Sequence, residues 1–141
     1  MPYCSLEDLL AQVPESVLVS LTDDEGTGQV NQGRIAQAIE DAQSEIDAYA
    51  QARYQVPFSP VPGVIRKIAV DITLYNLFSR RGFDEESADS VIVTRYKSAQ
   101  KFLENLSRGV VTIGVPEPPP DAETRFDYSE RMFTRKRLEV F

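Results

Sequence analysis

The chain has no histidine and no tryptophan, and Cys4 is its only cysteine among 141 residues. Histidine is the side chain that most often activates a nucleophile, and with cysteine it supplies the usual zinc ligands. One cysteine excludes an intrachain disulfide and is typical of a reducing compartment. We therefore expect no enzyme, no metal site and no cofactor, with Cys4 in a mobile terminal segment.

Long hydrophobic runs are also missing. No apolar stretch approaches the ~18 residues of a membrane span, and the N-terminus lacks a basic start followed by an apolar segment. We expect neither a membrane span nor a signal peptide. The length suits one domain that buries about 68–70% of its unfolded surface, enough for a core without disulfides or metal.

The charge is acidic and unevenly spread. The formal net charge is −7; residues 1–60 carry ten acidic against two basic side chains, whereas residues 61–110 carry eight basic against six acidic ones. Phosphate affinity comes from clustered lysine and arginine, so this balance disfavours a general nucleic-acid binder. It suits head-to-tail contacts between copies or repulsion of a polyanion, and ordinary solubility explains it equally well.

Helical periodicity dominates the sequence. Apolar residues recur at alternating steps of three and four, which predicts long helices at about 32–53, 62–81 and 87–108, after two short helices near 5–12 and 15–21. The 62–81 segment is apolar around most of its circumference and should be the central buried element. We expect Ile68, Ile72 and Tyr75 to be largely buried.

Helix ends carry recognisable signals. Ser5 with Asp8 three residues later approaches a capping box, and Asn31 is a good N-cap. Gly82 and Gly109 are typical stop residues. Asp71 interrupts the buried segment and needs a partner or a proton. Arg53 ends an apolar stripe and could pair with Asp71 or with a carbonyl at a helix C-terminus.

The remaining residues differ in character. Val110–Ile113 is a short β-prone run, prolines 116 and 118–120 form a stiff spacer, and the tail that follows is rich in aromatic and apolar residues. The expected fold is all-α: a compact antiparallel helical bundle over residues 1–113, with short β pieces after residue 109. Residues 114–141 form a Pro-rich spacer and an extended docking arm.

Several binding motifs fail on spacing. The acidic loop at residues 23–26 lacks the glycine and glutamate positions of an EF-hand, so it is better explained as a solvated turn. The glycines at 26, 28 and 33 do not form a dinucleotide loop, because Asn31 stands where a glycine is needed and no strand precedes them. Asp41 and Glu45 share an exposed helix face, where solvation is far more common than acid–base catalysis.

The most specific local patterns are Asp41-Ala42, Glu45-Ile46-Asp47, Arg53-Tyr54 leading to Pro57, and the run from Arg131 to Arg135. With these residues the chain resembles the small head–tail connector (adaptor) proteins of Mu-like phages and prophages over almost its full length. The resemblance implies a non-enzymatic virion protein, present in the host cytoplasm during assembly and then in the neck between capsid and tail. It also implies a homo-oligomeric ring, a dodecamer, beneath the portal protein.

In such a ring, genome DNA passes through the centre without specific binding, and further head-completion or tail proteins attach below. Ring contacts are heterologous, so two different faces of the chain must be complementary. Candidate subunit–subunit residues are Glu40, Asp41, Glu45 and Asp47 on the acidic helix and Arg95, Lys97 and Lys101 on the basic helix. Candidate partner-binding residues of the arm are Arg131, Met132, Phe133, Arg135, Leu138 and Phe141.

Two other classes of function remain open. A small nucleic-acid-binding regulator would use the basic tail at residues 135–137 and would bind DNA in a strongly salt-dependent way. A small hydrolase or ligand-binding helical protein would need an enclosed polar pocket, for which the sequence offers no set of residues.

Overall fold

The structure is a computed structural model, and it describes residues 2–82 and 89–114. In these ranges the chain forms five helices: α1 Leu6–Leu10, α2 Glu15–Thr22, α3 Gln32–Ala50, α4 Gly63–Arg81 and α5 Asp89–Arg108. The described residues include no strand, so the expected all-α fold is confirmed. None of these helices is long and apolar enough to cross a membrane.

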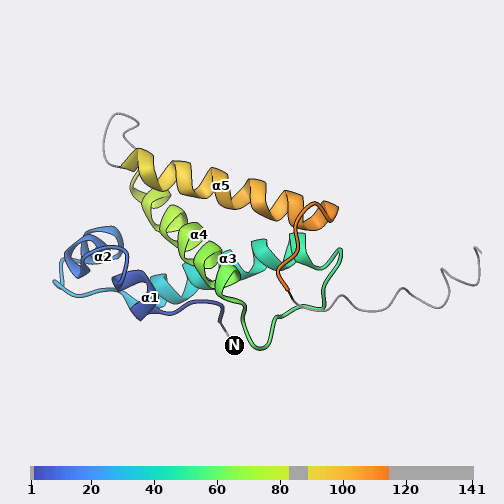
Figure 1. Cartoon of the computed structure of the whole chain (residues 1–141). Coiled ribbons are helices and arrows are strands. Elements are labelled where there is room, and N and C mark those ends of the chain that lie inside the picture. Colours follow the sequence, from blue (N-terminus) through green and yellow to red (C-terminus); the bar gives the residue numbers. More distant parts are fainter. Residues whose placement is uncertain (1, 83–88, 115–141) are drawn as a thin grey trace, which may run out of the picture.

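Helices α3, α4 and α5 pack against one another in pairs, and α1 and α2 both lie against α4. Figure 1 shows that α4 runs back in the opposite sense to α3 and α5, which confirms the antiparallel bundle. The two short helices lie at one side of this three-helix body, near the start of α3 in Figure 1.

Helix α4 is the centre of the core, as its apolar circumference predicts. Ile65, Ile72, Leu74 and Leu77 have no exposed surface. Ile68 is buried as expected, but Tyr75 is only half-buried. The ring of Tyr75 lies at the rim of the core, stacked on Tyr96 of α5 with centroids 3.7 Å apart. α3 and α5 complete the core with Ile35, Ile39, Ala42, Ile46, Ile92, Ala99, Leu103 and Leu106.

The helix starts follow the sequence signals. The Ser5 N–H donates to Asp8 Oδ2 at 2.9 Å, which confirms the capping box, and Asn31 Oδ1 accepts from the Arg34 N–H at 3.2 Å. α3, however, ends at Ala50 rather than at Arg53. The N–H groups of Arg53 and Tyr54 both bond to the Ala50 carbonyl, so the helix closes in a turn.

The early end of α3 has a physical cause further along the chain. Pro57 disfavours helical conformation at the residue before it, and a proline cannot donate a hydrogen bond. The turn buries the Tyr54 ring against Phe58, with ring centroids 6.0 Å apart. A continued helix would carry the chain away from this contact, so burial of the two rings favours the turn.

The predicted β pieces after residue 109 are wrong for residues 110–114, and the rest of that prediction lies outside the described residues. Gly109 adopts φ +81°, and the Val110 N–H bonds back to the Asn105 carbonyl at 2.9 Å, which is a Schellman ending. The chain then turns back onto the body, where Arg53 Nη1 donates to the carbonyls of Leu106 and Val111. The Arg53 guanidinium thus satisfies a carbonyl in the last turn of α5 and one in the segment that follows it.

Gly109 is the position in this turn where a side chain should be least tolerated. A Cβ there would lie 2.9 Å from Arg53 Nη1, in addition to the strain of a positive φ. We expect Gly109→Ala to lower the free energy of unfolding by about 1–2 kcal/mol, measured by urea titration. Gly28→Ala is the matched control, because Gly28 has φ +76° and no atom within 4 Å of the added Cβ. Equal losses for the two variants would show that the Arg53 contact is unimportant.

Candidate functional site

The N-terminal segment belongs to the core, which corrects the expectation that Cys4 lies in a mobile terminus. Tyr3 and Cys4 are 1% and 3% exposed. The Tyr3 hydroxyl donates to Asp47 Oδ1 of α3 and accepts from the Phe58 N–H at 3.0 Å. Burial raises the pKa of the Cys4 thiol, so Cys4 stays in the protonated, weakly nucleophilic form. Packing of Tyr3 between α3 and the 55–62 loop therefore holds the segment in place.

This hydrogen bond gives a pH-dependent prediction. Burial and the Asp47 carboxylate raise the pKa of Tyr3 above its usual value near ~10. The neutral phenol is the form that the fold favours, so its stabilisation is complete below about pH 10 and is lost as the pH rises through the folded pKa. Tyr3→Phe should cost ~1–3 kcal/mol in urea unfolding near neutral pH. The gap between wild type and variant should narrow above about pH 10; a constant gap would contradict the assignment.

The acidic candidates on α3 fall into two groups. Glu40 and Asp41 point outward, and Asp41 Oδ1 accepts from Gln37 Nε2 at 2.9 Å. Glu45 and Asp47 are half-buried and serve the chain itself: Glu45 accepts from the Tyr96 hydroxyl at 2.9 Å, and Asp47 accepts from Tyr3. Only the first two are therefore fully presented to a partner; we call them the α3 acidic face.

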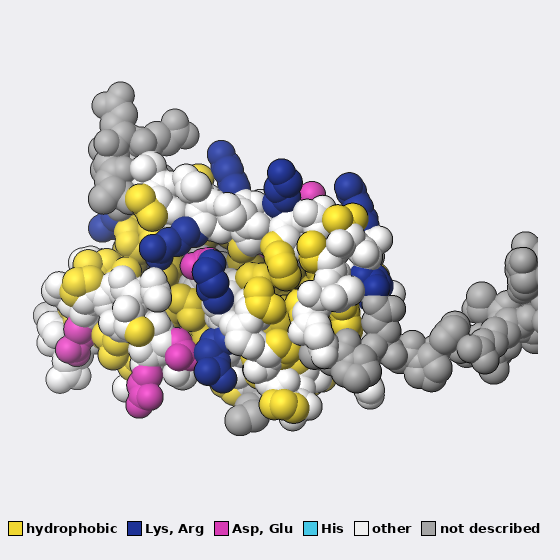
Figure 2. Space-filling model, in the orientation of Figure 1, with side chains coloured by type: hydrophobic (Ala, Val, Ile, Leu, Met, Phe, Trp, Pro, Cys, Tyr) yellow, Lys and Arg dark blue, Asp and Glu magenta, His cyan; other side chains and the backbone are white. Residues whose placement is uncertain are grey.

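The basic candidates on α5 are also divided. Arg95 lies beside α1 and donates to Gln12 Oε1 at 3.3 Å. Lys97 and Lys101 are two and six residues further on, which places them roughly 160° and 120° around the helix from Arg95. They form an outer ridge with Arg108, and Figure 2 shows dark blue side chains along the edge over α5. The structure does not bring the three candidates onto one face.

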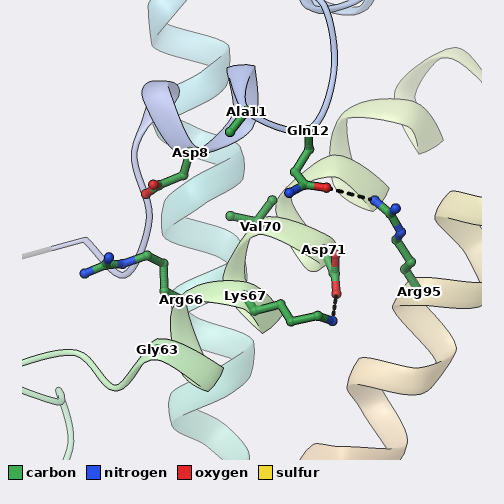
Figure 3. Close-up of a pocket in the computed structure, with 9 residues that line it drawn as sticks. All are labelled: Asp8, Ala11, Gln12, Gly63, Arg66, Lys67, Val70, Asp71 and Arg95. Atoms are coloured by element: carbon green, nitrogen blue, oxygen red, sulfur yellow. Dashed lines mark hydrogen bonds and ion pairs between the residues drawn. The ribbon is translucent and has the colours of Figure 1, made fainter.

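Arg95 instead lines a cleft between α1, α4 and α5. The cleft has a volume of about 330 Å³. Three cationic side chains surround it, Arg66 and Lys67 from α4 and Arg95 from α5, and Figure 3 shows them spread around the opening. Its other lining residues are Asp8, Ala11, Gln12, Gly63, Val70 and Asp71. We call this the cationic cleft.

Asp71 lies at the inner wall of the cationic cleft and is 6% exposed. Its Oδ2 accepts from Lys67 Nζ at 3.1 Å, one helical turn away, and this pair is drawn in Figure 3. The sequence left two partners open for Arg53, namely Asp71 and a carbonyl at a helix C-terminus. The structure shows the carbonyl, that of Leu106 in the last turn of α5. The buried carboxylate thus fixes one lysine at the mouth of the cleft, leaving Arg66 and Arg95 as the more available cations.

Sequence reasoning missed Arg66 and Lys67. The Lys67–Asp71 spacing of four residues was a usable signal, because such pairs meet on one helix face. Nothing in the sequence indicated that α1 would close the third side of the cleft. The six arm residues predicted to bind a partner, from Arg131 to Phe141, lie outside the described residues.

The side chains at this cleft are not grouped as metal ligands are. Among residues 2–82 and 89–114, no group of three or more Cys, Asp or Glu side chains is placed to hold a metal ion. Lysine and arginine donors around a concave surface are instead suited to recognition of carboxylates or other anions. The cleft is therefore a candidate interaction site.

A model of the protein family described as bacteriophage Mu, Gp36 matches residues 3–129. The chain belongs to this family. It is 25% identical over 122 residues to the Mu-like prophage FluMu protein gp36 of Haemophilus influenzae, covering 86% of this chain and 82% of that protein. It is 27% identical over 116 residues to gene product J of Escherichia phage Mu, covering 82% and 78%. The resemblance to proteins of Mu-like phages and prophages is thus confirmed.

Proposed function

We propose that this chain is a structural virion protein: a head–tail connector, or adaptor, that forms a homo-oligomeric ring beneath the portal. The observation that carries the proposal is the placement of complementary charge in a member of a phage family. One side of the bundle carries the α3 acidic face, and another carries the cationic cleft. A closed ring needs two such different faces on every copy, because each copy uses one face toward each neighbour.

In this proposal the chain has no enzymatic role and takes no cofactor. The ring, of twelve copies, lies in the neck between capsid and tail, after assembly in the host cytoplasm. The portal protein lies above it, and further head-completion or tail proteins attach below. A net charge of −7 suits a conduit for DNA, because an acidic wall repels phosphate and lets the genome slide.

Electron cryomicroscopy of the neck of phage particles that encode this chain tests the proposal. The expected result is a ring of helical subunits between portal and tail, into which the α3–α5 bundle fits. Immunogold labelling with antibody against the chain should mark the same level. A neck without the bundle, or the chain absent from purified particles, would overturn the proposal.

A simple binding measurement distinguishes the proposed connector from the alternative, a DNA-binding regulator. We expect the purified full chain to bind duplex DNA only feebly at physiological salt, because its described cations are scattered over the cleft, the α5 ridge and other parts of the bundle. Fluorescence anisotropy with a labelled duplex measures this over a range of salt concentrations. Micromolar or tighter binding at physiological salt would favour the regulator instead.

A further inference from the structure

The cationic cleft and the α3 acidic face lie across the bundle from each other. α4 contacts α3 through Asn76, whose Nδ2 donates to the Ala38 carbonyl at 3.5 Å. Lys67 lies nine residues before Asn76, which places it roughly 180° around α4, on the side away from α3. Glu40 is six residues before the fully buried Ile46, and so roughly 120° around α3 from the side that faces the core. The centre of the cleft, at Lys67, therefore points away from the α3 acidic face. Arg66 is ten residues before Asn76, roughly 80° around α4, and lies at the edge of the cleft beside the N-terminal segment.

We propose that the cationic cleft of one copy receives the α3 acidic face of the next copy, with Glu40 and Asp41 entering opposite Arg66 and Arg95. This inference rests on the proposed ring and names the two surfaces that close it. In a ring of twelve, neighbouring copies differ in orientation by only roughly 30°, so the contact faces must lie nearly opposite each other on each copy. The centre of the cleft, at Lys67, meets that requirement against the α3 acidic face.

Both surfaces hold charge that the chain itself leaves unpaired. Within the part of the chain that the structure describes, the exposed side chains of Arg66 and Glu40 make no hydrogen bond and no ion pair. Arg95 has only an uncharged partner, Gln12. An unpaired cation on one side and an unpaired carboxylate on the other are the complementary groups that orient two copies in one register.

Shape favours the cleft over the α5 outer ridge as the receptor. Lys97 and Lys101 project from a convex helix surface, where ion pairs contribute little because water screens them. The cleft is concave, with a volume of about 330 Å³, so an entering carboxylate would lose part of its water and interact more strongly with the cations there. A convex helix face also fits a groove between helices, because the side-chain ridges of one helix pack into the grooves of its neighbours.

Apolar side chains near the rim add to this surface. Of the large hydrophobic residues in the described ranges, Leu10, Val91 and Val110 are the exposed ones. Leu10 is next to the lining residue Ala11 on α1, and Val91 is one helical turn before Arg95 on α5. Burying two apolar side chains around a charged centre supplies affinity, while the charges supply specificity.

A charge-swap series in the full-length chain tests this contact. Arg66→Glu and Glu40→Lys should each weaken self-association by roughly tenfold or more, because each places like charges opposite each other at every interface. The double variant Glu40→Lys/Arg66→Glu reverses every pair and should restore association. The assembly mass is measured by light scattering over a range of concentrations. Arg108→Glu, on the α5 ridge, is the matched control and should associate as the wild type does.

Disulfide capture locates the same contact in assembled particles. Glu40→Cys/Arg66→Cys copies in phage necks should crosslink into a ladder of multimers under oxidation, while the buried native Cys4 alone should give none. If the ring forms but the single charge reversals do not weaken it and the cysteine pair does not crosslink, the cleft contact is wrong. The proposed ring itself would remain supported. Self-association of Arg66→Glu could instead be restored by reversing the charges of Glu117, Asp121 and Glu123, and not by reversing Glu40. That result would identify the Pro-rich spacer, rather than the α3 acidic face, as the segment that binds in the cleft. Absence of any ring from the necks would overturn the proposed function as well.

Discussion

A chain truncated after Thr124 should fold normally and yet be absent from phage particles. The missing residues carry the aromatic side chains Phe133 and Phe141 around a cationic run, behind a Pro-rich spacer that is unsuited to helix. Such a segment gains most by laying its side chains into grooves of a neighbouring subunit or of the portal. Buried aromatic and arginine residues dominate the energy of many interfaces, so we expect loss of incorporation to be complete.

The measurement is the amount of chain in purified particles, by immunoblot, when the truncated gene replaces the full one. Thermal unfolding of the purified truncated protein is the companion experiment. Its Tm should stay close to that of the full chain, because Tyr3 to Leu106 form a complete buried cluster, with Val111 and Ile113 packed against it. Phe133→Ala/Phe141→Ala should reproduce most of the defect, whereas Lys136→Ala should not. Normal incorporation of the truncated chain, or an unfolded body, would show that the arm has a different role.

Local features of the fold were predictable because they depend on residues close in sequence. The period of α3 identified its buried stripe, and Asn31 marked its start, since an N-cap acts on an N–H only three residues away. Gly109 marked the end of α5 for a similar reason. The end of α3 was missed because it depends on Tyr54 packing against Phe58 in the following turn.

Long-range features were not predictable from such signals. Nothing near Tyr3 indicates that its hydroxyl meets Asp47, 44 residues away, so the N-terminal segment was wrongly expected to be mobile. The candidate site was partly predictable. Helical geometry alone separates Arg95 from Lys97, which are two residues apart and so roughly 160° apart around α5. The cleft itself needs α1 to lie against α4, and that placement depends on the whole core.

Ile72→Ala should be the most damaging single change in the core. Ile72 lies in the middle of α4 and has no exposed surface. Helix α4 packs against each of the other four described helices. Removing three carbon atoms there leaves a cavity that the surrounding helices can close only in part. We expect a loss of ~2–5 kcal/mol in the free energy of unfolding, measured by urea titration.

The size of that loss decides whether α4 is the centre of the fold. Val110→Ala is the matched control, because Val110 is 69% exposed and its N–H bond to Asn105 does not involve the side chain. It should change stability by less than about half a kcal/mol, as most surface substitutions do. A similarly small loss for Ile72→Ala would mean that the helices hold together without α4. The core would then not hold α4 in place, and the cationic cleft, which α4 lines with Arg66 and Lys67, would lack a fixed position on the bundle.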